Sequence, residues 1–310
     1  MKRLFRQKGI SVLLPTQNER RIAPLSIRSF LDFADEIIVV DNGSTDGTVE
    51  IVKELAVKHQ KVQFYNRPDI HHLYENRQFA LERSKYQWIC RFDSDYIAYT
   101  SGNYDVRELR EIMLNTRPGF PPKVFGVMRV NVTGDFWHTG VSYDKVPKDE
   151  RPYIFEQLSG PEIRIYQYFP GLRFVRRNRR EGIAFEKLLT YSNLPSRIDL
   201  KKPYWMHCMI KSDMNYFFRS ERPNWRATGD FDRYPTLESY MMDIILEKYG
   251  TTSIEEACHL FMHNRFYPLL KPYDDSCYPY PKIVHEQMKQ TPMYFIEETG
   301  QGFVRHELLQ

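Results

Sequence analysis

The chain has 310 residues, of which 42% are apolar and 27% are charged, with a formal net charge of +4. This composition excludes an intrinsically disordered protein, and the length allows one large α/β domain with a modest appendage. The nearly balanced charge excludes a general nucleic-acid-binding surface, so we expect no nucleic-acid partner.

The sequence gives no signal for a membrane span or for cross-links. No stretch comes near the roughly 20 apolar residues that a span needs, and residues 1–6 lead into a short strand rather than a signal-peptide core. The four cysteines lack a short paired spacing, which argues against a disulfide framework or zinc knuckle and favours a reducing compartment. We expect a soluble, cytoplasmic protein, with peripheral membrane contact through basic and aromatic patches left open.

Three apolar strands with polar ends dominate the first hundred residues. The first begins near Ile10 and breaks at Pro15 into a polar turn, and the second, residues 36–40, ends in the turn 41–48. The third, residues 87–92, ends in the acidic triplet 93–95. Because helix-like sequence follows each strand, the pattern predicts a parallel α/β sheet with one functional edge.

Apolar periodicity places the remaining elements. We expect helices near residues 23–33, 49–59, 76–83, 106–115, 206–219 and 237–248. We expect strands at residues 124–132, around Trp137 and Tyr143, and at residues 162–166. No internal repeat or low-complexity linker divides the chain, so a single domain with a C-terminal wrap is the simplest organisation.

Two groups of side chains in the second half allow two interpretations each. A run of arginines is either a solvated face or a clamp for an anionic donor, acceptor or lipid phosphate. Its members are Arg173, Arg176, Arg177, Arg179 and Arg180. Four rings could stack on a sugar acceptor, although core packing accounts for at least half of them. These are Trp137, His138, Trp205 and Trp225.

The triplet Asp93-Ser94-Asp95 is the most informative motif. Two carboxylates at i and i+2, delivered by a rigid strand, can hold a hard divalent cation and leave coordination positions for phosphate oxygens. An isolated Asp-x-Asp is more often a solvated turn. The two strand-turn segments upstream favour a metal-diphosphate site instead.

The chain resembles the family 2 glycosyltransferases, whose fold is called GT-A. The resemblance rests on four segments in the same order and spacing, namely Pro15–Glu19, Asp35–Thr48, Arg77 with Ala80-Leu81, and Phe92–Asp95. It is firm over about residues 8–100 and thinner beyond, where residues 164–166, residues 170–174 and His207 continue it.

The resemblance implies a GT-A fold, with a Rossmann-like, nucleotide-binding mixed sheet flanked by helices and a C-terminal acceptor-side region. Within one domain over residues 1–310, it implies a nucleotide-sugar-binding half over about 8–100. An acceptor-binding and catalytic half would follow over about 120–220, and a C-terminal wrap over about 221–310.

For the leaving diphosphate, the resemblance implies that Asp93 and Asp95 hold Mn²⁺ or Mg²⁺, with His207 as a third ligand. An imidazole ligand would favour Mn²⁺. For the nucleotide, Asp41 can accept a hydrogen bond from a uracil imide, and Glu19 can accept from ribose hydroxyls. The full set of nucleotide-binding candidates is Pro15, Thr16, Glu19, Asp41, Arg77 and Ser94. Asp46 is expected to cap the helix that begins near Val49.

The catalytic base is the part that the resemblance defines least. An inverting displacement needs a carboxylate within reach of the acceptor hydroxyl; Glu181 is the first candidate and Asp135 the second. Arg180-Glu181 stands where the family often has His-Glu. Tyr96 replaces a frequent acidic residue, and Gln78 stands where Asn is common. If neither Glu181 nor Asp135 lies within reach of the acceptor hydroxyl, a retaining front-side attack is the alternative.

We therefore expect a metal-dependent glycosyltransferase that moves a sugar from a UDP-sugar to a glycan, lipid-linked or glycoconjugate acceptor in surface polysaccharide biosynthesis. One alternative is a nucleotidyltransferase acting on a sugar phosphate, although the turn at 15–19 lacks the Gly-rich loop that cradles a triphosphate. A non-catalytic nucleotide- or glycan-binding protein with the same fold is the other. The oligomeric state, the sugar and the acceptor stay open, because loops rather than the fold set them.

Overall fold

The computed structural model describes residues 6–70, 72–142, 154–177, 180–185, 195–290, 294–300 and 302–307. By its internal packing the chain divides into two compact units. The first comprises residues 1–130, 158–208 and 278–287, and the second comprises residues 131–157, 209–277 and 288–310. The single domain predicted over residues 1–310, with its boundaries near 100, 120 and 220, stays a prediction.

An eight-stranded mixed sheet, in the order β3-β2-β1-β4-β8-β6-β11-β5, forms the framework of the first unit. Its strands are β1 (Gln7–Thr16), β2 (Glu36–Asp41), β3 (Val62–Asn66), β4 (Tyr86–Arg91), β5 (Tyr96–Ala98), β6 (Lys123–Thr133), β8 (Leu158–Gln167) and β11 (Ser196–Met209). The strands from β3 to β4 are parallel, whereas β8 pairs antiparallel with β4 and with β6, and β5 pairs antiparallel with β11. The predicted α/β class with a mixed sheet is confirmed.

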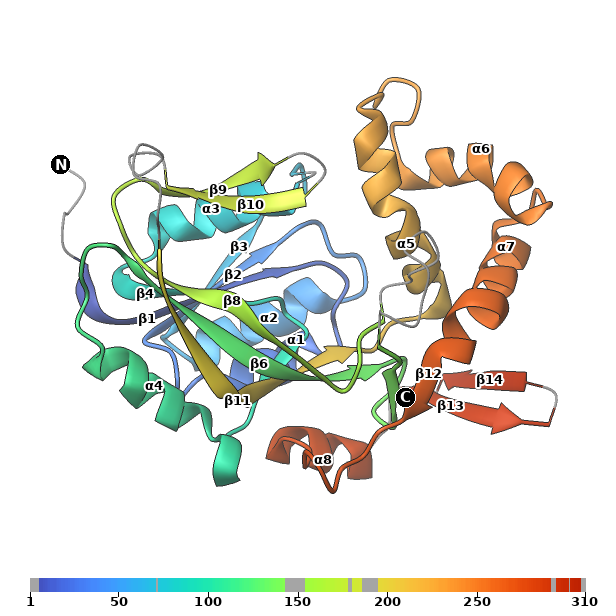
Figure 1. The fold of residues 1–310 in the computed structure, drawn as a ribbon. Helices are drawn as coiled ribbons and strands as arrows, with labels where there is room; N and C mark the ends of the chain where they lie inside the picture. Colours follow the sequence, from blue (N-terminus) through green and yellow to red (C-terminus); the bar gives the residue numbers. More distant parts are fainter. Residues whose placement is uncertain are drawn as a thin grey trace. The chain divides into compact units, whose positions relative to one another are not determined.

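Helices cover both faces of this sheet (Figure 1). They are α1 (Ala23–Ser29), α2 (Thr48–Lys58), α3 (Leu73–Arg83) and α4 (Val106–Asn115). Because side chains alternate along a strand, Val12 and Leu14 pack in a cluster with α1, α2 and α4, whereas Leu13 packs in another with α3. The hairpin of β9 (Leu172–Arg177) and β10 (Arg180–Phe185) lies on the α3 side, where Leu172 joins the same cluster as Leu13.

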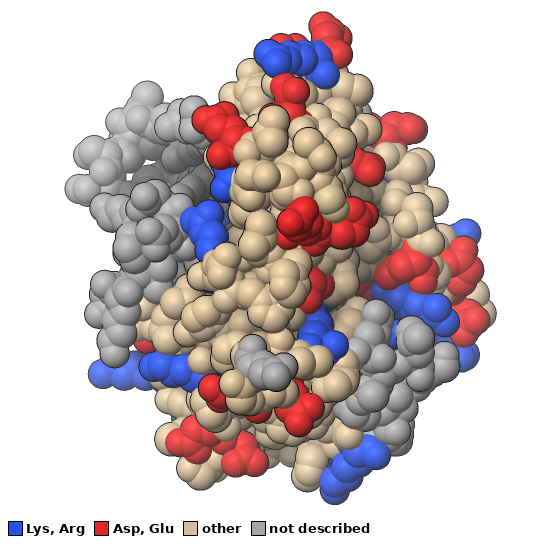
Figure 2. Space-filling model, turned by 90° about the vertical axis from the view of Figure 1, so that its right-hand side faces the viewer, with Lys and Arg blue, Asp and Glu red and all other residues tan. Residues whose placement is uncertain are grey.

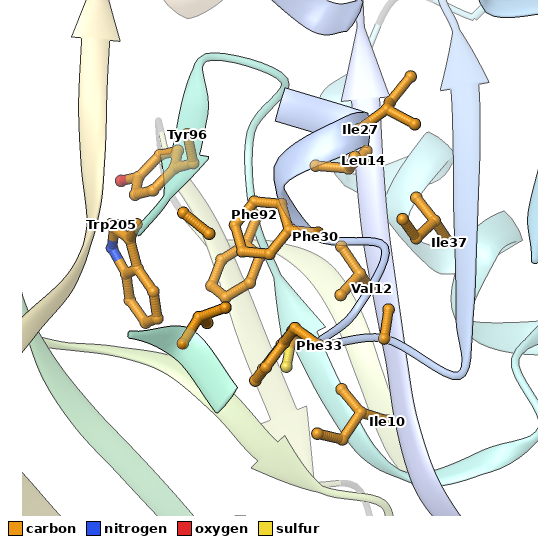
Figure 3. Packing of buried hydrophobic residues seen from close by; sticks show 14 of the residues in the cluster. Ile10, Val12, Leu14, Ile27, Phe30, Phe33, Ile37, Phe92, Tyr96 and Trp205 are labelled. Atoms are coloured by element: carbon orange, nitrogen blue, oxygen red, sulfur yellow. The ribbon is translucent and has the colours of Figure 1, made fainter. Parts of the chain in front are cut away.

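Aromatic rings fill the core between the sheet and helices α1 and α4 (Figure 3). Phe92 stacks on Phe30 at 4.8 Å between ring centroids and lies 4.7 Å from Trp205. Phe30 and Trp205 are fully buried. Trp205 is therefore a core residue rather than a sugar-stacking platform.

The second unit is mainly helical. Its helices are α5 (Asp213–Thr228), α6 (Leu237–Tyr249) and α7 (Ile254–Phe261), and its short strands form the pairs β7 (His138–Gly140) with β12 (Leu270–Pro272) and β13 (Tyr294–Thr299) with β14 (Gly302–Glu307). Its core gathers Phe217 from α5, Met241 and Ile245 from α6 and Phe261 from α7. Helix α8 (Lys282–Gln290) and short helical turns at Gly102–Tyr104, Met262–Phe266 and Tyr267–Leu269 complete the elements.

One predicted helix is wrong in its first turn. Residues 206–209 of the expected helix 206–219 end strand β11, and α5 begins only at Asp213. Met206 and His207 pair with β5, so backbone hydrogen bonding to a neighbouring strand overrides the local helical pattern. Ser212 marks the true start, because its hydroxyl accepts a hydrogen bond from the Asn215 backbone N–H at 3.3 Å.

Most other predicted elements are present. The helix expected at 106–115 and that at 237–248 match α4 and α6, and α2 begins at Thr48. Helix α1 is shorter than expected and ends at Ser29. The strand expected around Trp137 is confined to His138–Gly140, and the one around Tyr143 lies outside the described residues.

The surface carries charges of both signs. Figure 2 shows acidic and basic side chains interspersed over one face of the molecule, with apolar and neutral residues between them. Among the described residues, no helix is long and apolar enough to cross a membrane.

We predict that Phe30→Ala lowers the free energy of unfolding by about 3 to 5 kcal/mol, because it removes a fully buried ring that contacts Phe92 and Phe33. Urea denaturation followed by circular dichroism measures the change. Val57→Ala is the matched control, since Val57 is 87% exposed on α2, and it should change the stability by less than about 0.5 kcal/mol. Equal effects of the two substitutions would contradict the assignment of the core.

Candidate functional site

Two turns at the carboxyl edge of the parallel strands are tied together by hydrogen bonds. Asn18, with a left-handed φ of 54°, accepts from the Thr45 backbone N–H at 2.8 Å through its side chain, and its own N–H donates to the Ser44 hydroxyl at 2.8 Å. Asp46 accepts from the backbone N–H groups of Arg20 and Thr48, each at 3.0 Å. The expectation that Asp46 caps α2 is wrong, because Gly47 occupies the N-cap position and no side chain caps the helix; Asp46 lies one residue earlier and accepts from the first helical residue, Thr48.

Thr16 and Asp41 end the adjacent strands β1 and β2 and face each other in register. The Asp41 carboxylate is fully buried and accepts from the backbone N–H groups of Gly43 at 2.9 Å and Ser44 at 2.8 Å, and from the Ser44 hydroxyl. The Thr16 hydroxyl oxygen is buried and has no hydrogen-bond partner among the described residues. A buried, unsatisfied hydroxyl at a strand end is a group that a bound ligand can satisfy.

Three further nucleotide-binding candidates, Pro15, Glu19 and Ser94, lie at or just beyond the ends of strands β1 and β4. Pro15 is buried in β1, and Glu19 is half-buried in the turn that leads to α1, where its carbonyl accepts from the N–H groups of Ile22 and Ala23. Ser94 is 4% exposed in the turn after β4. Because β4 pairs with β1 in parallel, this turn shares the edge with the other two.

The Asp93 carboxylate lies between two arginines that the fold brings from different elements. Arg77, on α3, contacts one carboxylate oxygen, and Arg164, on β8, donates to the other at 3.3 Å. Both guanidiniums are buried, and the Asp93 side chain is 27% exposed. Arg77 is a predicted nucleotide-binding residue, and in the structure it contacts Asp93.

The electrostatic balance at Asp93 favours the ionised carboxylate. Burial alone would raise its pKa, but the positive charges of Arg77 and Arg164 outweigh burial and lower the pKa of Asp93 to about 2. The two buried cations and the carboxylate therefore form a charged cluster at neutral pH, to which the nearby Asp95 adds a second carboxylate.

Asp95 and His207 are brought together by strand pairing. His207 on β11 is the register partner of Tyr96 on β5, and the Asp95 carbonyl accepts from the Cys208 N–H at 2.7 Å. The His207 Nε2 atom consequently lies 3.5 Å from Asp95 Oδ1. Burial is the main reason that the pKa of His207 falls to about 4, so the imidazole is neutral near pH 7.

Tyr96 forms a platform between these groups. Its ring stacks on His207 with 4.7 Å between centroids, and the Arg164 guanidinium lies 5.1 Å from its ring centre. Its hydroxyl accepts from Arg129 at 3.3 Å. The aromatic residue at a position that is often acidic in the resembled family thus orients the histidine.

Arg129 and Glu162 are site residues that sequence reasoning missed. One carboxylate oxygen of Glu162 lies 2.8 Å from a guanidinium nitrogen of Arg164, and the other oxygen contacts the guanidinium of Arg129. The available signal was the alternation of charged and apolar residues along β8, because Glu162 and Arg164 project from the same face of a strand. Gln78 has a structural role instead, since its side chain accepts from the Phe174 N–H at 2.9 Å and ties α3 to β9.

The donor types at Asp93, Asp95 and His207 fit a divalent cation. Carboxylate oxygens suit Mg²⁺ and Mn²⁺, and a neutral imidazole is the form that binds a metal. Within the described residues, however, no three His, Cys, Asp or Glu side chains are gathered as a metal site. The Asp93 carboxylate instead contacts the guanidiniums of Arg77 and Arg164.

The two candidate bases differ in their surroundings. Asp135, in the second unit, is fully buried, and its oxygens accept from the Trp137 N–H at 2.9 Å and the Ile296 N–H at 2.8 Å and lie 2.8 Å from His138 Nδ1. Those contacts give it a structural role. Glu181 lies in β10 opposite Arg176, and its side chain is outside the described residues.

The arginine run and the remaining tryptophans are placed only in part. Arg173 is exposed on β9, the side chains of Arg176, Arg177 and Arg180 are not described, and Arg179 lies outside the described residues. Trp137 packs edge-on against Phe295 at 5.5 Å. The indole N–H of Trp225 donates to the Tyr234 carbonyl at 3.0 Å, so this ring is fixed within the second unit.

We predict that His207 makes the protein less stable in mild acid. Its pKa is about 4 in the folded chain against an ordinary 6.5, so the unfolded chain binds the extra proton first, and stability is lost as the pH falls from 6.5 towards 4. From pH 7 to pH 5 the wild type should lose about 2 kcal/mol more unfolding free energy than His207→Gln. Urea titrations at both pH values in EDTA measure this, and equal losses would contradict it.

Comparison with known proteins was made for the sequence and for the fold. Residues 11–101 match the model of glycosyl transferase family 2. An uncharacterised glycosyltransferase of Rickettsia typhi is 47% identical over 51 residues, which are 16% of this chain and 18% of that protein. One of Rickettsia prowazekii is 34% identical over 88 residues, 28% of each. The matched segments thus span less than a third of these relatives.

Among solved structures, the chain is similar to S. aureus TarS 1-349. The complex of TarS with UDP gives a TM-score of 0.43 at 18% identity and covers 69% of this chain and 64% of TarS. The complex of TarS 1-349 with UDP-GlcNAc gives a TM-score of 0.43 at 14% identity. The match covers 96% of this chain and 97% of that TarS chain. The segment that matches the model of glycosyl transferase family 2, residues 11–101, carries Asp41, Asp93 and Asp95.

Proposed function

We propose that this chain is a glycosyltransferase that moves a sugar from a nucleoside diphosphate donor, a UDP-sugar, to a hydroxyl of a glycan, lipid-linked or glycoconjugate acceptor. The observation that carries the proposal is the cluster of Asp93, Asp95, Arg77 and Arg164 at the carboxyl edge of the sheet, beside Thr16 and Asp41. The match of residues 11–101 to the model of glycosyl transferase family 2 supports the proposal.

The nucleoside would bind against the tied turns that follow β1 and β2. The buried Thr16 hydroxyl offers an unsatisfied polar atom there. Three protein donors hold the Asp41 carboxylate rigidly, and a carboxylate with about four acceptor positions can receive one more, such as a uracil imide. Recognition by a group already fixed in place costs little ordering entropy.

The diphosphate would bind at the charged cluster. Two buried guanidiniums flank Asp93, and their positive charges would stabilise the negative charge that develops on the leaving group. Glu162 holds Arg164 from the other side, so that arginine has a fixed orientation before a substrate arrives. Such preorganised charge avoids reorganisation during bond cleavage.

Asp93, Asp95 and His207 would hold Mn²⁺ or Mg²⁺. When bound, the cation would supply Lewis-acid stabilisation of the departing diphosphate. The residues contribute negative charge from the carboxylates and a neutral imidazole that stacking on Tyr96 keeps in orientation.

The displacement is proposed to be inverting, with Glu181 as the base that takes the proton from the acceptor hydroxyl. Its strand β10 forms a hairpin with β9, whose N-terminal residue Leu172 packs in the same cluster as Leu81 of α3. Helix α3 also carries Arg77. The hairpin therefore belongs to the same unit as the charged cluster.

We predict that Asp95→Asn lowers UDP release from the preferred UDP-sugar by at least about a hundredfold, because a metal-binding carboxylate becomes a neutral amide. A coupled UDP-release assay with a panel of UDP-sugars, with and without Mn²⁺, measures the effect. Asp199→Asn is the control, since Asp199 is 45% exposed and pairs with Arg197 on the surface.

Binding measurements separate the metal from catalysis. Titration calorimetry should show Mn²⁺ binding to the wild type and to Asp199→Asn, and a much weaker signal for Asp95→Asn. Turnover that persists in EDTA would refute the metal-dependent proposal. Pyrophosphate release from UTP and a sugar phosphate would identify a nucleotidyltransferase, and tight UDP binding without transfer to any acceptor would identify a binding protein.

We predict that Glu181→Gln lowers kcat by about 10²- to 10⁴-fold and leaves the Kd for UDP unchanged, because a base acts on the acceptor and not on the nucleotide. Steady-state kinetics and UDP titration measure the two quantities. Glu82→Gln, on the exposed side of α3, should change neither. Unchanged kcat in Glu181→Gln would exclude this residue as the base.

A further inference from the structure

A buried carboxylate in the second unit ties together two segments that are far apart in sequence. Asp135 is fully buried, and one of its oxygens accepts from the Trp137 N–H at 2.9 Å and lies 2.8 Å from His138 Nδ1. Its other oxygen accepts from the N–H of Ile296, on β13, at 2.8 Å. The segment that leads into β7 and strand β13 are therefore fixed to each other through one side chain.

Three aromatic rings on the second unit contact one another beside this junction. Trp137 meets Phe295 edge-on, with 5.5 Å between the ring centroids and 86° between the ring planes. Phe295 also lies nearly parallel to the ring of His306, its register partner on β14, at 6.2 Å and 23°. Phe295 is still 38% exposed. The rings therefore form an aromatic surface that stays open to solvent.

Hydrogen-bonding atoms border these rings. Within the described ranges the indole N–H of Trp137 and the Nε2 atom of His138 make no hydrogen bond, and neither is among the buried polar atoms, so both reach solvent. Because Asp135 accepts at His138 Nδ1, we assign the ring proton to Nδ1, which leaves Nε2 of the neutral ring as an acceptor. The Glu297 carboxylate, 3.1 Å from His306 Nε2 and 53% exposed, adds further acceptors.

A second aromatic pair in the same unit has the same ring geometry without this polar border. Phe231 is also 38% exposed and meets Trp225 edge-on at 5.6 Å. The indole N–H of Trp225, however, donates to the Tyr234 carbonyl at 3.0 Å. The pair at Phe295 is therefore distinguished by the hydrogen-bonding atoms it leaves available and not by the packing of its rings.

An aromatic surface bordered by a donor and acceptors is complementary to a pyranose ring. The C–H groups on one face of a pyranose pack on the negative face of an aromatic ring, and its hydroxyl groups both donate and accept hydrogen bonds. We propose that Trp137, Phe295 and His138 form a binding site for a neutral pyranose ring of a glycan, with Phe295 as the stacking ring. Because Asp135 already fixes both segments, little conformational entropy is lost on binding. The site does not depend on the proposed transferase function.

Saturation-transfer NMR on the full chain tests the site with three probes: methyl β-glucopyranoside, methyl β-galactopyranoside and the methyl β-glycoside of N-acetylglucosamine. We expect at least one glycoside to receive saturation, most strongly at the ring C–H protons of the face that lies against Phe295. Phe295→Ala should raise the Kd of that glycoside by at least about fivefold, because it removes the stacking ring.

Phe231→Ala is the matched control, because Phe231 has the same exposure and the same edge-on contact with a tryptophan in the same unit. It should leave the Kd of the glycoside unchanged. Trp137→Phe guards against a folding defect, since it keeps an aromatic ring and removes only the indole N–H. It should raise the Kd by at least about twofold, the effect of one lost hydrogen bond. Circular dichroism and the Tm of each variant are measured alongside.

Benzyl alcohol distinguishes a sugar site from a plain apolar patch, because it offers a ring face with a single hydroxyl group. Saturation of benzyl alcohol without saturation of any glycoside would identify such a patch and overturn the proposal. Equal Kd values for the wild type, Phe295→Ala and Trp137→Phe would overturn it as well, and so would the absence of saturation in all three glycosides.

Discussion

The parallel pairing of β1 with β2 on one side and β4 on the other is the constraint on which the candidate site depends. It places Thr16 opposite Asp41 and Leu13 opposite Arg91, so that three strands end at one edge. The polar turns that follow must then lie side by side. Hydrogen bonds between the turn at Asn18 and the turn at Ser44 fix them to each other.

The charged groups at this edge stabilise one another in a shared network. Asp93 contacts both Arg77 and Arg164. Glu162 contacts Arg164 from the other side and also contacts Arg129, so arginines and carboxylates alternate along the network. Such a network holds each cation in one orientation, at the desolvation cost that buried charges carry.

Local sequence determined the elements whose signals lie within a few residues of one another. Apolar runs ending in polar turns defined β1, β2 and β4, and the helical spacing of residues 106–115 defined α4, because side-chain periodicity alone determines which face is buried. The positions of Asp41, Asp93 and Asp95 at strand ends followed directly. Strand β3 gave a weaker signal, since only Val62 of its five residues is buried.

The tertiary structure decided how distant residues meet those carboxylates. His207, which only the family resemblance placed beside the aspartates, reaches Asp95 because β11 pairs with β5, a pairing that also converts the start of an expected helix into a strand. Arg164 reaches Asp93 because β8 adds antiparallel to β4. Pairing between strands far apart in sequence is set by burial of the whole sheet and by backbone hydrogen bonding, and no short window of sequence contains that information.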